Sequence, residues 1–143
     1  MQTVPSSAER YRKARADAAS ELAADYLELI EDLITECGEA RATDLATRMG
    51  VSHVTISKAL QRLMRSGYVT YRPYRSIFLT ESGRAIAKAA REKHLTMLNF
   101  LLSIGVPADI AEQDAEGMEH HVSSETLSAM NKHLARLGTS SSL

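Results

Sequence analysis

Residues 42–65 read ATDLATRMGVSHVTISKALQRLMR, and this stretch decides the fold. Apolar residues at helical spacing predict a short helix over 42–49. Gly50 can adopt a positive φ and make a tight turn, after which Ser52 caps a second helix over 53–65. A short helix, a glycine turn and a second amphipathic helix are typical of a helix-turn-helix DNA-binding motif.

The residues that follow predict a β-hairpin. Residues 68–71 and 76–80 alternate in polarity and are rich in residues that favour strands. Between them, residues 72–75 read RPYR and form a turn with two guanidinium groups at its tip. A hairpin with a basic tip directly after a helix-turn-helix is a wing. In that arrangement the second helix enters the major groove and the wing lies along the DNA backbone.

Seven side chains of this region are candidates for DNA contact. Hydroxyl and imidazole groups can hydrogen-bond base edges or phosphates, and guanidinium groups bind phosphates. For any one of them, the alternative is an exposed side chain that does not touch DNA. The candidates for base or phosphate contact are Ser52, His53, Thr55 and Lys58, and those for phosphate binding are Arg62, Arg72 and Arg75. The apolar positions expected to face inward on the same helix are Val54, Ile56, Leu60, Leu63 and Met64.

The distribution of charge agrees with this interpretation although the net charge is only −1. Residues 41–80 carry seven Lys or Arg against one acidic residue, which gives +6. Residues 1–40 sum to −5 and residues 81–143 to −2. A basic middle between acidic flanks indicates a local phosphate-binding surface, or alternatively a basic face that is merely solvated.

The whole pattern predicts a mainly α protein. An N-terminal winged helix-turn-helix, with three helices and a two-stranded wing, is followed by an all-helical domain. Outside the motif, helices are expected over residues 18–37, 81–102, 108–121 and 123–137. The expected organisation is a flexible arm over 1–19, a DNA-binding domain over 20–80, a helical metal-binding and dimerisation domain over 81–137, and a flexible tail over 138–143.

Six oxygen- and nitrogen-bearing side chains recur at helical spacings outside the motif. Residues three or four apart share a helix face, so each group can converge on one point. None of the six is a cysteine, and carboxylates with imidazoles suit a hard-to-borderline divalent metal. The alternatives are a solvated acidic face and a structural histidine. The candidate metal ligands are Asp25, Glu28, His94, Glu116, Glu119 and His120.

Composition excludes several other classes of protein. The one cysteine, Cys37, rules out an intramolecular disulfide. No run of 18 apolar residues occurs and the N-terminus lacks a signal-peptide core, so we expect a cytoplasmic protein without membrane contact. No nucleophile triad, glycine-rich phosphate loop or His-Glu-x-x-His motif occurs, so we expect no catalytic residues and no small organic substrate.

The winged motif, DYLE at 25–28, His94 and DAEGMEHH at 114–121 together resemble the diphtheria-toxin-repressor family, most closely its manganese transport regulator branch. The resemblance covers about residues 20–137. It implies a homodimer that binds a palindromic operator in double-stranded DNA, with a metal site between the DNA-binding and dimerisation domains. It also implies repression of manganese uptake genes when the metal is plentiful.

The ligand types separate the branches of that family. Iron-responsive members of the family have a methionine and a cysteine among their metal ligands, and the resemblance places Asp25 and Glu116 of this chain at the matching positions. Carboxylates at these positions favour Mn(II) over the metals that prefer sulfur ligands. Four carboxylates balance two divalent ions, so two Mn(II) per subunit are expected, with Fe(II) or other divalent metals as alternatives.

Two other functions remain open at this point. A binuclear carboxylate enzyme would carry Glu-x-x-His pairs, which are absent from this sequence. A winged-helix regulator of another signal would leave the acidic residues merely solvated.

Overall fold

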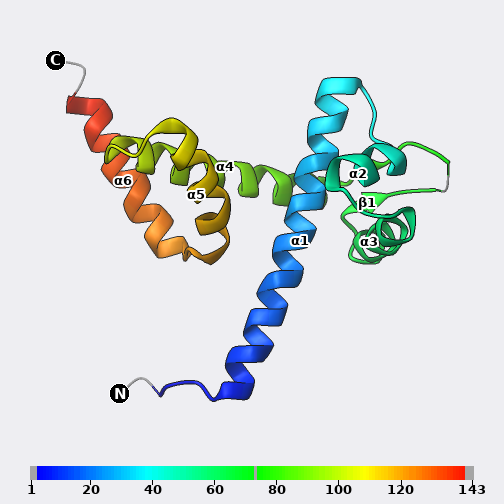
Figure 1. Ribbon diagram of the computed structural model, residues 1–143, viewed down its shortest axis with the longest axis horizontal. Coiled ribbons are helices and arrows are strands. Elements are labelled where there is room, and N and C mark those ends of the chain that lie inside the picture. The colour runs from blue at the N-terminus through cyan, green and yellow to red at the C-terminus, as the bar shows by residue number, and fades with distance from the viewer. Residues whose placement is uncertain (1–2, 73, 141–143) are drawn as a thin grey trace. The chain divides into compact units, whose positions relative to one another are not determined.

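Helices account for most of the computed structural model, which describes residues 3–72 and 74–140. Figure 1 shows the elements in chain order. They are α1 (Ser7–Cys37), α2 (Ala42–Met49), α3 (His53–Arg65), β1 (Val69–Thr70), β2 (Phe78–Leu79), α4 (Glu81–Ser103), α5 (Ala108–Met118), the 3₁₀ turn η1 (Glu119–His121) and α6 (Ser124–Ser140). The chain divides into unit 1 (Met1–Lys88) and unit 2 (Ala89–Leu143), and α4 begins in the first and ends in the second.

Unit 1 is built around apolar side chains from α1, α2, α3 and the hairpin. Helix α1 contributes a stripe spaced by three or four residues, which is the spacing that places side chains on one helix face. Each of the other elements adds residues that are removed from water, and this burial holds α3 in place. The fully buried members include Leu27, Ile30, Leu45, Ile56, Leu60, Val69 and Ile77.

The helix-turn-helix forms as expected. Gly50 ends α2 with φ = 68°, and the Ser52 hydroxyl accepts a hydrogen bond from the Thr55 N–H at 3.2 Å to cap α3. The expected inward face of α3 is wrong at its margins, because Val54 is 63% exposed and Met64 is 42% exposed. Only the central stripe of the helix therefore meets the core, which leaves a broad surface of α3 in water.

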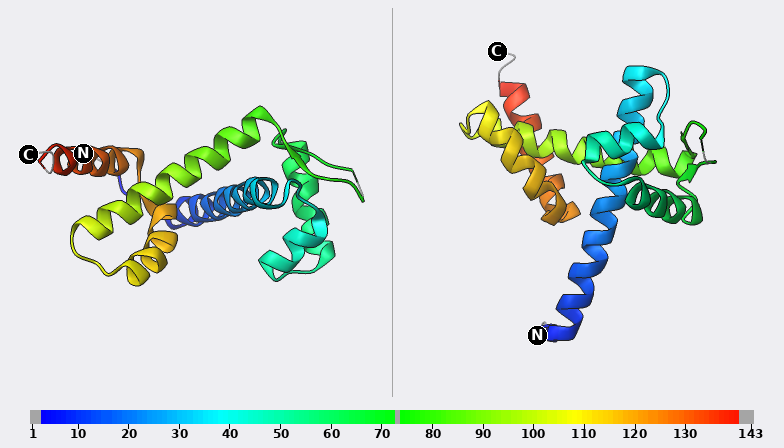
Figure 2. Two further views of the ribbon diagram at one scale, coloured as in Figure 1. Left: turned by 90° about the horizontal axis from the view of Figure 1, so that it is seen from above. Right: turned by 45° about the vertical axis from the view of Figure 1, so that its right-hand side comes forward.

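The hairpin is shorter than expected but has the antiparallel register of a wing. Val69 pairs with Leu79 and Thr70 with Phe78, so each strand is two residues long. The segment before α2 extends the pairing, because the Ile77 N–H donates to the Ala40 carbonyl at 2.8 Å. Both views in Figure 2 show the hairpin loop projecting from the rest of unit 1.

Helix α1 begins at Ser7, so the expected start near residue 18 is wrong. A capping box sets this start: the Ser6 hydroxyl accepts from the Glu9 N–H at 3.2 Å, and the Glu9 carboxylate accepts from the Ser6 N–H at 2.6 Å. Residues 7–16 are exposed and consist mostly of charged residues and alanine, so they lack the apolar periodicity on which the expected boundary was based.

Unit 2 packs the later part of α4 against α5, through a core of Met97, Leu101, Ala111 and Ala115. The expected single helix over 108–121 is wrong. The α-helix ends at Met118, and Glu119–His121 form a 3₁₀ turn. Helix α6 then starts at Ser124, where the Ser123 hydroxyl accepts from the Thr126 N–H at 3.2 Å, and it continues past the expected end at 137.

Gly83 provides a test of how the first turn of α4 packs. A Cβ added here would lie 2.1 Å from the Tyr68 carbonyl oxygen, which is a backbone atom and cannot rotate away. We expect Gly83→Ala to lower the free energy of unfolding by about 1–3 kcal/mol, the usual range for overpacking. The measurement is thermal unfolding of the metal-free protein by circular dichroism.

Gly117→Ala is the matched control, because its added Cβ in α5 meets no atom within 4 Å beyond its chain neighbours and the backbone of its own helix. Alanine favours a helix interior over glycine by up to about 1 kcal/mol, so this variant should be at least as stable as the parent. Equal melting temperatures for the two variants would contradict the packing described for Gly83.

Candidate functional site

The predicted DNA-contacting side chains are all exposed on unit 1. Helix α3 buries Ile56, Leu60 and Leu63 against the core, so its remaining faces point to water. The Ser52 and Thr55 hydroxyls lie 3.0 Å apart and form the cap of α3, so both are already engaged locally. The exposed candidates are Ser52, His53, Thr55, Lys58, Arg62, Arg72 and Arg75.

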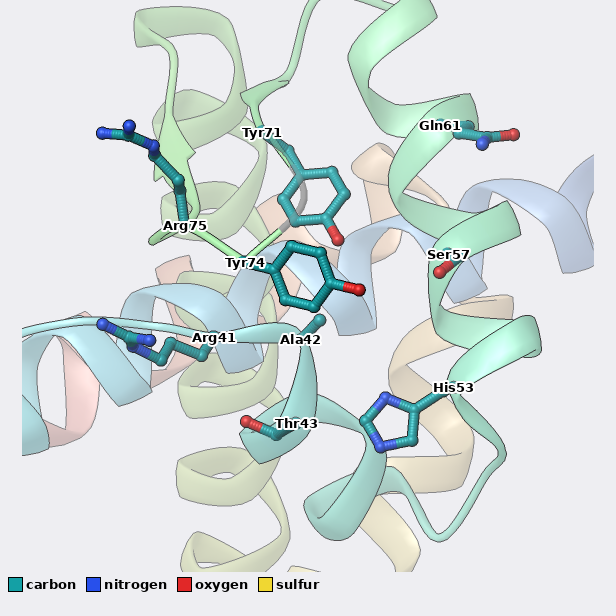
Figure 3. Close-up of a pocket in the computed structure, with 9 residues that line it drawn as sticks. All are labelled: Arg41, Ala42, Thr43, His53, Ser57, Gln61, Tyr71, Tyr74 and Arg75. Atoms are coloured by element: carbon teal, nitrogen blue, oxygen red, sulfur yellow. The ribbon is translucent and has the colours of Figure 1, made fainter.

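A groove of about 410 Å³ separates α3 from the wing. Three elements line it: the start of α2, one face of α3 at a spacing of four residues, and the hairpin. Figure 3 shows the rings of Tyr71 and Tyr74 between α3 on one side and two guanidinium groups on the other. The lining residues are Arg41, Ala42, Thr43, His53, Ser57, Gln61, Tyr71, Tyr74 and Arg75. Of the seven predicted residues, the groove therefore brings together His53 and Arg75.

Arg41 is a groove residue that the sequence did not single out. Its Nε donates to Glu39 Oε1 at 2.9 Å, and Glu39 Oε2 accepts from the Ser76 hydroxyl at 2.7 Å. Hydrogen bonds from Ser76 and Arg41, together with the Arg41 charge, lower the pKa of Glu39 below its ordinary value. Glu39 thus ties the segment before α2 to the wing. The Ser76 contact spans 37 residues, so no local sequence signal could have revealed it.

Tyr74 is the second groove residue without a sequence signal. It is 98% exposed and adopts φ = 64°, the only positive φ at a non-glycine position within residues 3–72 and 74–140. A large aromatic side chain that is almost wholly in water at the tip of the wing is available for contact with a partner. Aromatic rings next to guanidinium groups form surfaces on which the sugars and bases of nucleic acids pack.

Unit 2 contains a buried carboxylate with histidines around it. Glu119 is 5% exposed, and its Oε2 lies 2.6 Å from Nδ1 of His94. His120 Nε2 lies 3.8 Å from Glu119 Oε1. Burial raises the pKa of Glu119 above its ordinary value, and the two imidazoles limit that rise. The 3₁₀ turn positions Glu119 inward and His120 beside it.

His94 has a second carboxylate neighbour. Its Nε2 lies 3.2 Å from Glu112 Oε2, on α5, a residue that the sequence did not indicate as functional. Burial lowers the pKa of His94, but hydrogen bonds and charges from Glu119 and Glu112 outweigh burial and raise it above the ordinary value. The spacing of Glu112 from Glu116, four residues on the same helix, was the available signal.

The other three predicted ligands do not share the contacts that join His94, Glu119 and His120. Glu116 is exposed, and its charge contributes to the raised pKa of Glu119. Asp25 and Glu28 are half-buried on α1 in unit 1. In the part of the chain that the structure describes, no three His, Cys, Asp or Glu side chains are arranged to hold a metal ion. Of the six, the structure brings His94 and His120 near Glu119 through pairwise contacts, but not into an arrangement of three that could hold an ion.

The donor set of this cluster nevertheless fits a divalent cation. A carboxylate taken out of water needs compensating positive charge, and the imidazoles of His94 and His120 supply it to Glu119 here. Carboxylate oxygen and imidazole nitrogen are the ligands that Mn(II), Fe(II) and Zn(II) share in proteins. A divalent cation would supply that compensating charge, with His94, Glu119 and His120 as its holders in unit 2.

Both units match one family of sequences. Residues 19–77 match the model of the N-terminal DNA binding domain of iron dependent repressors, and residues 80–141 match their metal binding and dimerisation domain. Within the described residues, no helix has the length and apolarity to span a bilayer.

Individual relatives agree with the family models. The transcriptional regulator MntR of Salmonella typhimurium is 49% identical over 132 residues, 92% of this chain and 84% of that protein. MntR of Escherichia coli O157:H7 is 51% identical over 121 residues, 85% and 78% of the two chains. The solved structure of a manganese-dependent transcriptional repressor in complex with manganese is 31% identical with a TM-score of 0.69. That match covers 79% of this chain and 52%, about half, of the other. The chain thus belongs to the iron-dependent, or diphtheria-toxin, repressor family and is a DNA-binding transcriptional regulator, not an enzyme.

Proposed function

We propose that this regulator responds to Mn(II) and represses manganese uptake genes when the metal binds. The observation that carries the proposal is the buried Glu119 carboxylate between His94 and His120, in the unit that matches a metal-binding domain. The likeness to a manganese-dependent repressor supports the choice of metal. Asp25 and Glu116 bear carboxylates and not sulfur, which favours Mn(II) over softer ions. Fe(II) is the runner-up.

The six proposed ligands are divided between the units. Asp25 and Glu28 belong to unit 1, and the other four belong to unit 2. We propose that these six residues together bind two Mn(II) ions per subunit, as the resemblance to the family implies. Without metal, the carboxylates repel one another, so the ensemble of domain arrangements is broad. Neutralising the carboxylates with metal would narrow the ensemble of domain arrangements. Metal binding would then strengthen DNA binding, and DNA binding would strengthen metal binding by the same factor.

The dimer follows from the same proposal. Two copies joined through residues 80–141 would present two α3 helices to a palindromic operator, whose half-sites must match the distance between them. We expect the dimer to bind its operator in the cytoplasm, where bacterial DNA lies. The N-terminal turns of α1 lie outside the core and carry four exposed basic residues, Arg10, Arg12, Lys13 and Arg15. These side chains either contact DNA phosphates or are solvated.

The metal switch can be tested with one buried carboxylate. Glu119→Gln keeps the shape of the side chain but removes its charge, so Mn(II) should no longer strengthen operator binding. In the parent protein, Mn(II) should strengthen it at least tenfold, the lower part of the usual range for allosteric coupling of about 5–150-fold. The measurement is fluorescence anisotropy with operator DNA, with Mn(II), Fe(II) and Zn(II) compared at equal free concentration.

Asp114→Asn is the control, because Asp114 is an exposed carboxylate on α5, the helix that precedes the turn with Glu119, and is not a proposed ligand. It should behave like the parent protein. Operator binding by the parent that is equal with and without Mn(II) would rule out the switch. Calorimetry that detects no stoichiometric Mn(II) binding would instead favour a regulator of another signal.

We propose further that the groove between α3 and the wing binds the DNA backbone. If α3 lies in the major groove, the strand that borders it passes between α3 and the wing, where Arg41 and Arg75 line the groove. Arg41→Ala and Arg75→Ala should each weaken operator binding several-fold and lower the slope of log K against log salt by about 1, the effect of one lost phosphate contact.

Arg48→Ala is the matched control for Arg41. Arg48 lies at the other end of α2, pairs with Glu36 at 2.8 Å as Arg41 pairs with Glu39 at 2.9 Å, and does not line the groove. The slope for Arg48→Ala should equal that of the parent. A common slope for all three arginine variants would show that the groove does not hold the backbone.

A further inference from the structure

The His94 imidazole has a carboxylate at each ring nitrogen. Nδ1 lies 2.6 Å from Glu119 Oε2, and Nε2 lies 3.2 Å from Glu112 Oε2. The two carboxylates differ in their surroundings, because the Glu119 side chain is 7% exposed and the Glu112 side chain is 58% exposed. His94 therefore connects a buried carboxylate to one at the surface of α5.

We propose that Glu112 is a positioning residue: it accepts a hydrogen bond from Nε2–H of His94 and so leaves Nδ1, on the side of Glu119, as the nitrogen that binds metal. This inference rests on the proposed metal-dependent function. A metal-bound histidine is neutral and carries one proton, and the hydrogen bond made by the other nitrogen selects which nitrogen keeps it. Glu112 is placed to make that selection.

The geometry argues against Glu112 as a ligand of the same ion. The two nitrogens of an imidazole ring point in diverging directions, so an ion bound at Nδ1 lies away from a group at Nε2. On the Nδ1 side, Glu119 Oε2 lies 2.6 Å from Nδ1 of His94. The other oxygen of the same carboxylate, Oε1, lies 3.8 Å from Nε2 of His120. Glu112 lies at Nε2, on the opposite side of the ring, so it would act on the metal through His94.

A carboxylate in this position orients the ring and increases its basicity. Loss of such an outer partner typically lowers metal affinity by about 10–100-fold. The ring would otherwise rotate or change tautomer, since His94 is part-exposed on α4 with a side-chain exposure of 21%. Glu112 also belongs to the rigid part of the unit, because Ala111 and Ala115 on either side of it are fully buried.

The test compares Mn(II) affinity, measured by calorimetry on the full chain, among three variants. Glu112→Ala should bind Mn(II) at least tenfold more weakly than the parent. Glu112→Gln retains an oxygen that can accept from Nε2–H, so it should recover most of that loss. Asp114→Ala removes a charge two residues away, on another side of α5, and controls for general electrostatics. Circular dichroism establishes that each variant is folded.

A second measurement reports on the ring itself. In the Zn(II)-loaded protein, which is diamagnetic, long-range ¹H–¹⁵N spectra should show the His94 proton on Nε2, with the signal assigned by loss in His94→Gln. In Glu112→Ala this proton should exchange faster with water. A purely structural effect of the substitution would not change the exchange of one ring proton.

The outcomes separate this inference from the proposed function. If the parent protein does not bind Mn(II), the proposed function fails. The positioning role alone is overturned if the parent binds Mn(II) and Glu112→Ala matches Asp114→Ala or binds more tightly. It is also overturned if Glu112→Gln is as weak as Glu112→Ala, or if the Zn(II)-loaded ring carries its proton on Nδ1.

Discussion

The burial of Glu119 is the constraint on which the chemistry of unit 2 depends. Removing an ionised carboxylate from water costs several kcal/mol, roughly, unless positive charge or hydrogen bonds replace the lost hydration. Here His94 and His120 provide that replacement, and Ala115 packs fully buried in the turn before. The two imidazoles that make the burial tolerable, together with the Glu119 carboxylate itself, are the kinds of donor that a divalent cation prefers. In the protein without metal, His94 therefore supplies part of the charge compensation that a cation would give to the Glu119 carboxylate.

The DNA-binding face depends on a different kind of interaction, one between segments far apart in the chain. Glu39 holds Arg41 and Ser76, and Ile77 pairs with Ala40, so the wing is fixed to the segment before α2. This fixation sets the distance between α3 and the wing, and with it the width of the groove between them. If the groove holds the DNA backbone as proposed, a defined width would reduce the conformational entropy lost on binding.

Local patterns in the sequence predicted the winged helix-turn-helix well, because its signals lie close together: Gly50 for the turn, Ser52 for the cap and the alternation after residue 67 for the hairpin. The start of α1 was missed because a capping box, and not apolar periodicity, sets it. The 3₁₀ turn at 119–121 was missed because periodicity cannot tell its first residues from a continuing α-helix. The Ser76 partner of Glu39 and the carboxylate partners of His94 lie in other segments of the chain, so only folding reveals them.

The tip of the wing places two demands on one residue. Tyr74 adopts φ = 64°, a conformation that costs a non-glycine residue about 1 kcal/mol or more. A glycine at this position would relieve that strain and give a more stable free protein, but it would remove the ring from the groove. The stability of the folded protein and its affinity for a partner are therefore opposed at this position. Selection for thermal stability alone would be expected to remove the aromatic ring, and selection for affinity to keep it.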